Sequence, residues 1–185
     1  RWCRLVMASP EGLSVAGVVL AAGASTRFGA ETRDGFPGPK QLAPFDGEPL
    51  LRRICRRLTT TKLHPLVVVL GYQAEQVRAA ISGLDVVAIE NPDFTSGQAS
   101  SVRCGLDALP GTTDAAVFVP ADQPFVDAGL IAGLIDRHTT TGKPIVVPRC
   151  GARRGAPVFF ARSQFEDLRR LEGDEGGRQL IRAHP

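Results

Sequence analysis

Short apolar runs alternate with amphipathic stretches along this chain, and this alternation is the feature that most constrains the fold. An uninterrupted apolar run is typical of a strand that is buried on both faces of a parallel sheet. The sequence therefore predicts strands in six places: Val15–Ala21, Leu66–Leu70, Asp85–Ile89, Ala115–Val119, Ile145–Val147 and Val158–Phe160.

Helical periodicity fills the intervals between these runs. We expect helices from Pro49 to Leu58, Gln73 to Ile81, Ser96 to Leu109, Asp127 to His138 and Ser163 to Leu171. Strands that alternate with helices form a parallel sheet covered on both faces, and right-handed crossovers make it doubly wound. The predicted fold is therefore a three-layer, Rossmann-like α/β fold with a mostly parallel sheet, in which ligands bind beyond the carboxyl ends of the strands.

Composition narrows the class of protein. The chain has 185 residues, of which 43% are hydrophobic and 22% charged, and these values are typical of one globular domain rather than a disordered chain or a coiled coil. We expect residues 1–12 to form a flexible leader and residues 13–185 to form a single domain. The net charge of only +3 argues against a nucleic-acid partner, and no apolar run reaches the 18 residues of a membrane span.

The four cysteines, Cys3, Cys55, Cys104 and Cys150, are scattered and show no C-x-x-C spacing. This pattern indicates neither a zinc site nor a disulfide framework. We therefore expect reduced thiols and a cytoplasmic location.

Polar residues follow the first predicted strand in a segment of small residues, residues 20–29. Small residues let the backbone approach a ligand closely, and successive N–H groups hold phosphate oxygens. Arg27 adds a bidentate cation, and Lys40, in the segment Pro39-Lys40-Gln41-Leu42, adds a compact charge suited to phosphate. The alternative interpretations are an ordinary tight turn and a surface lysine.

Two other strand ends also carry polar residues. Asp122 follows the fourth predicted strand, where a carboxylate is costly unless it is paired or binds a metal such as Mg²⁺; the alternative is an aspartate in a turn. The segment from Asn91 to Ser100 offers amide and hydroxyl groups beside a helix start, although an ordinary N-terminal cap explains it nearly as well.

Together these groups suit in-line attack at a phosphorus atom, where catalysis consists mostly of positioning and charge neutralisation. The loop after the first strand lacks the Gly-Lys-Ser/Thr ending of a Walker loop, so it is not a Walker loop. It also lacks the Gly-x-Gly-x-x-Gly pattern, which argues against a nicotinamide-dependent oxidoreductase. The arginines of the 49–58 helix are better explained as a solvated helix face than as a phosphate site.

These motifs resemble the nucleotidyltransferases that act on molybdenum cofactor, and more specifically the cytidylyltransferase branch. The resemblance covers nearly the whole chain after Val15. It rests on Leu20-Ala21-Ala22-Gly23-x-Ser25-x-Arg27-Phe28-Gly29, Pro39-Lys40-Gln41-Leu42, Val69-Leu70-Gly71-Tyr72, Asn91-Pro92-Asp93-Phe94-x-x-Gly97-x-x-Ser100-Ser101-Val102, Ala121-Asp122-Gln123-Pro124, Arg154-Gly155-x-Pro157-Val158 and Gly173-Asp174-Glu175-Gly176-Gly177-Arg178.

The resemblance implies a reaction and a set of site residues. CTP and a molybdopterin-type acceptor would be the substrates, Mg²⁺ the metal, and a molybdenum enzyme a recipient partner. Arg27, Lys40 and Asp122 would be catalytic, with Asp122 the metal ligand. The implied nucleotide contacts are Leu20, Ala21, Ala22, Gly23, Arg27, Lys40, Asn91, Gly97 and Ser100, and the implied pterin-side residues are Arg154, Gly155, Asp174 and Arg178.

Two alternatives stay open. The same chemistry fits GTP in place of CTP, or a sugar or polyol phosphate as acceptor. A protein of another class, a non-catalytic factor that holds the cofactor for a molybdenum enzyme, would also need a nucleotide-binding surface.

Overall fold

A six-stranded sheet organises the computed structural model, which describes residues 12–24, 38–151, 153–174 and 177–183. From one edge to the other its strands are β5 (Val87–Glu90), β4 (Leu66–Leu70), β1 (Val15–Ala21), β6 (Ala115–Pro120), β10 (Val158–Ala161) and β7 (Ile145–Val146). The first four strands are parallel, and β10 is antiparallel to both of its neighbours. The sheet is thus mostly parallel, as predicted.

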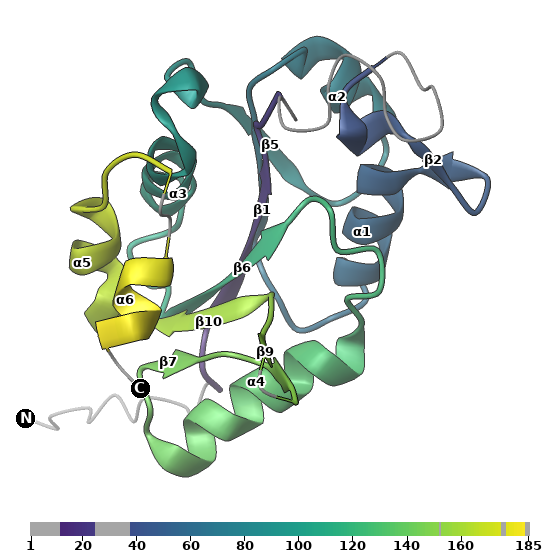
Figure 1. Cartoon of the computed structure of the whole chain (residues 1–185). Coiled ribbons are helices and arrows are strands. Elements are labelled where there is room, and N and C mark those ends of the chain that lie inside the picture. Colours follow the sequence, from purple (N-terminus) through teal and green to yellow (C-terminus); the bar gives the residue numbers. More distant parts are fainter. Residues whose placement is uncertain (1–11, 25–37, 152, 175–176, 184–185) are drawn as a thin grey trace, which may run out of the picture.

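Helices cover both faces of the sheet (Figure 1), which confirms the three-layer fold class. One layer contains α1 (Leu50–Leu58), α2 (Ala74–Ala80) and α4 (Ala128–Thr141). The other contains α3 (Gln98–Asp107), α5 (Phe165–Arg169) and α6 (Arg178–Ala183). Five of these helices match predicted ones, whereas α6 was not predicted.

Small elements complete the described chain. The hairpin of β2 (Pro44–Phe45) and β3 (Glu48–Pro49) precedes α1, and β8 (Arg149–Cys150) pairs with β9 (Arg153–Arg154). Short 3-10 turns lie at η2 (Lys40–Leu42), η3 (Phe94–Ser96) and η4 (Arg162–Gln164). Of the expected leader, only residue 12 is among the described residues.

Local chemistry explains where α4 begins and ends. Oδ1 of Asp127 accepts a hydrogen bond from the backbone N–H of Leu130 at 2.8 Å, which caps the first turn. Gly142 then ends the helix with φ +66°, a left-handed conformation that glycine adopts without steric cost.

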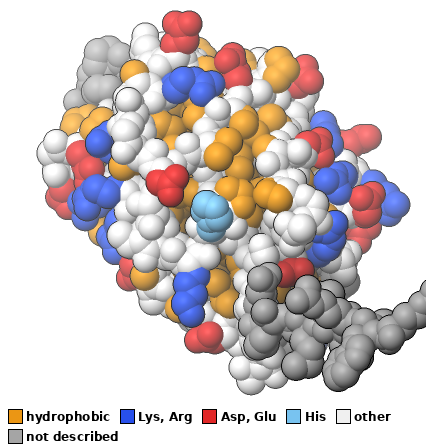
Figure 2. All heavy atoms as spheres, turned by 180° about the vertical axis from the view of Figure 1, so that it is seen from behind, with side chains coloured by type: hydrophobic (Ala, Val, Ile, Leu, Met, Phe, Trp, Pro, Cys, Tyr) orange, Lys and Arg blue, Asp and Glu red, His pale blue; other side chains and the backbone are white. Residues whose placement is uncertain are grey.

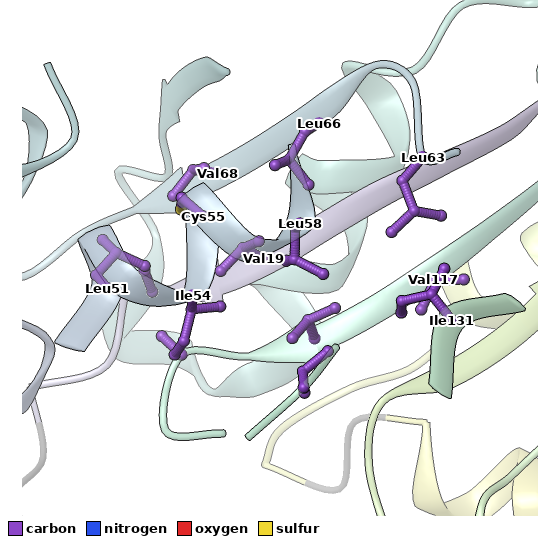
Figure 3. Close-up of a cluster of buried hydrophobic side chains, with 14 of the residues drawn as sticks. Val19, Leu51, Ile54, Cys55, Leu58, Leu63, Leu66, Val68, Val117 and Ile131 are labelled. Atoms are coloured by element: carbon purple, nitrogen blue, oxygen red, sulfur yellow. The ribbon is translucent and has the colours of Figure 1, made fainter. Parts of the chain in front are cut away.

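The larger core lies between the sheet and the layer that contains α1. Figure 3 shows Leu51, Ile54 and Leu58 of α1 directed at side chains of the sheet, including Val19 and Val68. These helix residues are spaced three to four apart, so they form one apolar stripe. The second core lies on the opposite face, where α3 and α5 pack on the sheet through residues such as Val102 and Leu168.

One predicted strand is less buried than its sequence suggests. The third apolar run was expected to be covered on both faces, but β5 forms the edge of the sheet and Val87 is 49% exposed. The apolar pattern therefore located the strand correctly and overestimated its burial.

The surface mixes charges of both signs. On the face shown in Figure 2, acidic and basic side chains are interspersed around exposed hydrophobic ones. Among the described residues, no helix combines the length and the apolar character that crossing a membrane requires.

Candidate functional site

A cavity of about 550 Å³ lies beyond the carboxyl ends of β1 and β6, where the fold class predicts a ligand. Residues from five segments that are far apart in sequence form its wall. They are Leu20, Ala22, Gly23, Ala24, Lys40, Gln41, Phe94, Thr95, Gly97, Gln98, Ser101, Pro120, Ala121, Asp122 and Asp174.

Lys40 and Asp122 meet at this cavity. The Lys40 Nζ atom lies 3.2 Å from Oδ2 of Asp122, and the two side chains are 32% and 46% exposed. The ends of β1 and β6 lie side by side because these strands pair in parallel, so the loops that follow them converge. The sequence predicted both residues as site residues, and the structure brings them together.

The loop after β1 is held by a residue that sequence reasoning missed. Nε2 of Gln41 donates hydrogen bonds to the carbonyl oxygens of Ala21, at 2.9 Å, and Gly23, at 2.8 Å. Of the predicted nucleotide contacts in this loop, Leu20, Ala22 and Gly23 line the cavity, whereas Ala21 is fully buried behind it.

Asn91 and Ser100, two other predicted nucleotide contacts, also lie behind the cavity wall. Nδ2 of Asn91 donates to the hydroxyl oxygens of Ser100 and Ser101 at 2.9 and 3.1 Å, and its Oδ1 accepts from the N–H of Asp93 at 3.0 Å. Asn91 and Ser100 therefore shape the turn before α3. Within the described residues, Ser101 and Gln98 reach the cavity from this helix instead.

Gly97, another of the residues predicted to contact a nucleotide, lines the first cavity, and the structure shows why glycine is required there. Its φ is +108°, and a Cβ atom would lie 2.5 Å from the carbonyl carbon and oxygen of Gly173. The Gly173 carbonyl accepts a hydrogen bond from the N–H of Ala99 at 3.0 Å, so the segment before α6 packs directly on the start of α3.

The resemblance groups Asp174 with Arg154 and Gly155. In the structure Asp174 lines the first cavity, and its Oδ1 accepts from the N–H of Gln98 at 3.3 Å. A carboxylate at a helix N-terminus is stabilised by the unpaired amides there.

A second cavity of about 610 Å³ adjoins the first, and Leu20, Gln98, Pro120 and Asp122 line both. Arg154 and Gly155, predicted for the pterin side, line this second cavity, and Arg182 joins them from α6. One guanidinium N–H of Arg154 donates to the Ile181 carbonyl at 2.9 Å, which ties β9 to α6.

Two further predicted residues are not fully described by the structure. Arg27 lies outside the described residues. Arg178 begins α6, but its side chain is not described.

Three arginines of α1 have protein partners that line neither cavity. Arg56 binds Glu48 at 2.5 Å, Arg53 lies 3.0 Å from Asp46, and Arg52 donates to the carbonyl of Ala80, at the end of α2, and to that of Ser82, just after it. The Arg56 guanidinium holds the pKa of Glu48 below its usual value. These contacts support the interpretation of this helix face as a surface rather than a phosphate site.

The carboxylates of the first cavity fit a magnesium ion better than a metal that needs many protein ligands. Among the described residues, no three His, Cys, Asp or Glu side chains are grouped closely enough to hold an ion. Mg²⁺ commonly uses one or two carboxylates and completes its shell with water and substrate phosphates. Asp122 and Asp174, both on the wall of the first cavity, are carboxylates of the kind that this ion uses.

Comparison with known proteins agrees with this geometry. The family model of the MobA-like NTP transferase domain matches residues 17–185. The bifunctional protein GlmU of Kineococcus radiotolerans is 33% identical over 143 residues, which cover 76% of this chain and 28% of GlmU. The chain thus spans little more than a quarter of that relative's length.

Two solved structures also resemble this chain over most of its length. A homologue of Mycobacterium tuberculosis rv0371c from Mycobacterium sp. strain JC1 superposes with a TM-score of 0.76 at 31% identity, over 92% of this chain and 81% of that one. Rv0371C of M. tuberculosis in complex with manganese superposes with a TM-score of 0.72 at 30% identity, over 94% and 85% of the two chains. The chain therefore belongs to the family of MobA-like NTP transferase domains.

Proposed function

We propose that this chain is a magnesium-dependent nucleotidyltransferase that moves CMP from CTP to the phosphate of a molybdopterin-type acceptor and releases pyrophosphate. The observation that carries the proposal is the position of Asp122. It pairs with Lys40 and lies on the boundary shared by two adjoining cavities. If each substrate occupies one cavity, the reacting phosphates must meet where the two cavities adjoin.

The residues of the first cavity suit a triphosphate. The Lys40 ammonium would neutralise phosphate charge, and the small residues Ala22 and Gly23 would let backbone amides approach the phosphates. Asp122, together with Asp174 on the wall of the same cavity, would hold Mg²⁺, which when bound supplies charge neutralisation and orients phosphate oxygens.

The reaction balances without a further reagent. An oxygen of the acceptor phosphate forms a bond to the α-phosphorus of the nucleotide. The bond from the α-phosphorus to the oxygen that bridges it to the β-phosphorus breaks, and pyrophosphate leaves with the electron pair. Residues that hold both substrates in line lower the barrier through orientation.

The second cavity supports an acceptor with a flat ring and an anionic group. Phe118, Phe160 and Val158 contribute apolar surface to its wall, while Arg154 and Arg182 contribute positive charge. A bidentate guanidinium is suited to phosphate. CTP as the donor rests on the resemblance of the Ala21-Ala22-Gly23 segment to the cytidylyltransferase branch.

The second candidate keeps the chemistry and changes the substrates to GTP or to a sugar or polyol phosphate acceptor. The Lys40–Asp122 pair favours this alternative as much as the first, because it would contact phosphates rather than a base. A factor that holds the cofactor without catalysis would use the same cavities.

The deciding experiment incubates the protein with Mg²⁺, each nucleoside triphosphate in turn, and either molybdopterin or a sugar phosphate. Pyrophosphate release and the mass of the dinucleotide product are measured. We expect release with CTP and molybdopterin. Release only with a sugar phosphate supports the second candidate, and nucleotide binding without release from any pair supports the non-catalytic factor.

Replacement of Asp122 tests the residue that carries the proposal. We expect Asp122→Ala to lower pyrophosphate release by about a hundredfold or more, because a charged group at the reacting phosphate is lost. The matched control is Asp136→Ala, which changes an exposed aspartate on α4. Full turnover of the Asp122 variant in Mg²⁺ would reject the proposed role.

A further inference from the structure

Gln41 makes contacts that go beyond filling space. It lies beside Lys40 in η2 and is only 5% exposed. A primary amide has two N–H groups, and those of Gln41 bind two carbonyl oxygens of one loop, Ala21 at 2.9 Å and Gly23 at 2.8 Å. The whole donor capacity of this side chain is therefore spent on the loop after β1.

The carbonyl between these two is also held. The oxygen of Ala22 accepts a hydrogen bond from the N–H of Tyr72 at 3.0 Å. Three successive carbonyl oxygens of the cavity loop are thus bound by protein donors. A carbonyl oxygen directed at a phosphate would repel it, so these bonds remove an obstacle to anion binding.

Holding a carbonyl also fixes the next N–H group. A trans peptide is planar, with its C=O and N–H pointing in opposite directions. The bonds from Gln41 therefore set the directions of the Ala22 and Ala24 N–H groups, and both residues line the first cavity. Within the described part of the chain, neither N–H meets an acceptor.

We propose that Gln41 is a positioning residue for the nucleotide: it orients the peptide planes of residues 21–24 so that the amides of Ala22 and Ala24 serve the triphosphate. This inference rests on the proposed function. Because Gln41 and Lys40 are adjacent, the same turn also sets the distance between that ammonium and the loop amides.

The test replaces Gln41 with methionine, whose side chain has a similar length and no N–H donor. We expect Gln41→Met to bind CTP, or whichever nucleoside triphosphate the wild type prefers, about tenfold or more weakly. In turnover, KM for the nucleotide should rise while kcat changes much less, because the bonds of Gln41 act on binding. Gln41→Asn, which keeps an amide but is one carbon shorter, should also weaken binding.

The chain offers a matched control. Gln164 is 7% exposed, lies in η4 and lines neither cavity. Gln164→Met also removes a buried amide, so thermal melting of both variants shows the structural cost of that change. We expect only the Gln41 variants to lose nucleotide affinity.

Direct binding titration distinguishes the possible failures. Gln41 variants that bind the nucleotide as well as the wild type, or a Gln164 variant that loses as much affinity, would overturn the inference. A wild type that binds nucleotide without any turnover would overturn the proposed enzyme activity. The nucleotide affinities of the wild type and the Gln41 variants could still be compared. A wild type that binds no nucleoside triphosphate would overturn both.

Discussion

At the residue scale, the contact between Lys40 and Asp122 illustrates an ion pair placed for chemistry rather than for stability. Both side chains are substantially exposed, and exposed pairs contribute about 1 kcal/mol or less to the free energy of unfolding. The pair nevertheless brings opposite charges to one edge of the cavity, where the proposed triphosphate and its metal would need both.

Replacement of Lys40 should separate these two roles. We expect Lys40→Ala to change the free energy of unfolding by about 1 kcal/mol or less. Its KM for the nucleotide should nevertheless rise clearly, because a phosphate-neutralising charge is gone. Urea unfolding and steady-state kinetics on the same preparation measure both. A large loss of stability with an unchanged KM would contradict the functional role.

The sequence located Asp122 because it directly follows a buried strand, and Lys40 because a lysine in the segment Pro39-Lys40-Gln41-Leu42 suits phosphate. Gln41 was not found, because the role of an amide depends on the carbonyls that it faces in the folded chain. For the same reason Asn91 and Ser100 were predicted as ligand contacts, whereas their hydrogen bonds run to one another and to the backbone.

At the element scale, the start of α3 and the segment before α6 depend on one another. Gly97 has no room for a side chain because Gly173 packs against it, and Asp174 caps the helix at Gln98. This contact also explains why α6 was not predicted, because a short helix has little periodic signal of its own and its position depends on packing.

A pair of glycine substitutions should have opposite effects. Gly97→Ala adds a Cβ in a left-handed backbone with a neighbour at 2.5 Å, and we expect it to destabilise the fold by about 1–3 kcal/mol. Gly133→Ala, inside α4 with no atom within 4 Å of the added Cβ, should stabilise it by about 0.5–1 kcal/mol.

Thermal melting of both variants checks the signs, and nucleotide titration checks whether Gly97→Ala also disturbs the cavity. A Gly97 variant as stable as the wild type would show that the backbone at Gly173 can move aside at little cost in free energy.

At the scale of the whole molecule, the sheet separates two hydrophobic cores. Leu51 is fully buried in the core beneath α1, and Leu168 is buried in the core beneath α5. The alternating pattern of the sequence predicted both layers, since apolar strands need cover on each face. It could not show that β5 lies at an edge, because burial there depends on strand order.

The separation of the cores predicts independent contributions to stability. Leu51→Ala and Leu168→Ala should each lower the free energy of unfolding by about 2–5 kcal/mol. The double variant should lose the sum to within about 0.5 kcal/mol, because the two sites share no partners. Chemical denaturation of the three variants measures this. A marked departure from the sum would show coupling through the sheet.

Asp174 lines the first cavity together with Gly23, which lies about 150 positions earlier along the chain. Contacts between such distant segments form late when a chain collapses, since closing a long loop is slow. If the first cavity holds the nucleotide, as proposed, nucleotide affinity should arise only once the segment at Gly173 and Asp174 has packed on the start of α3. In a refolding time course, a fluorescent nucleotide analogue would then report the completed molecule rather than an early intermediate.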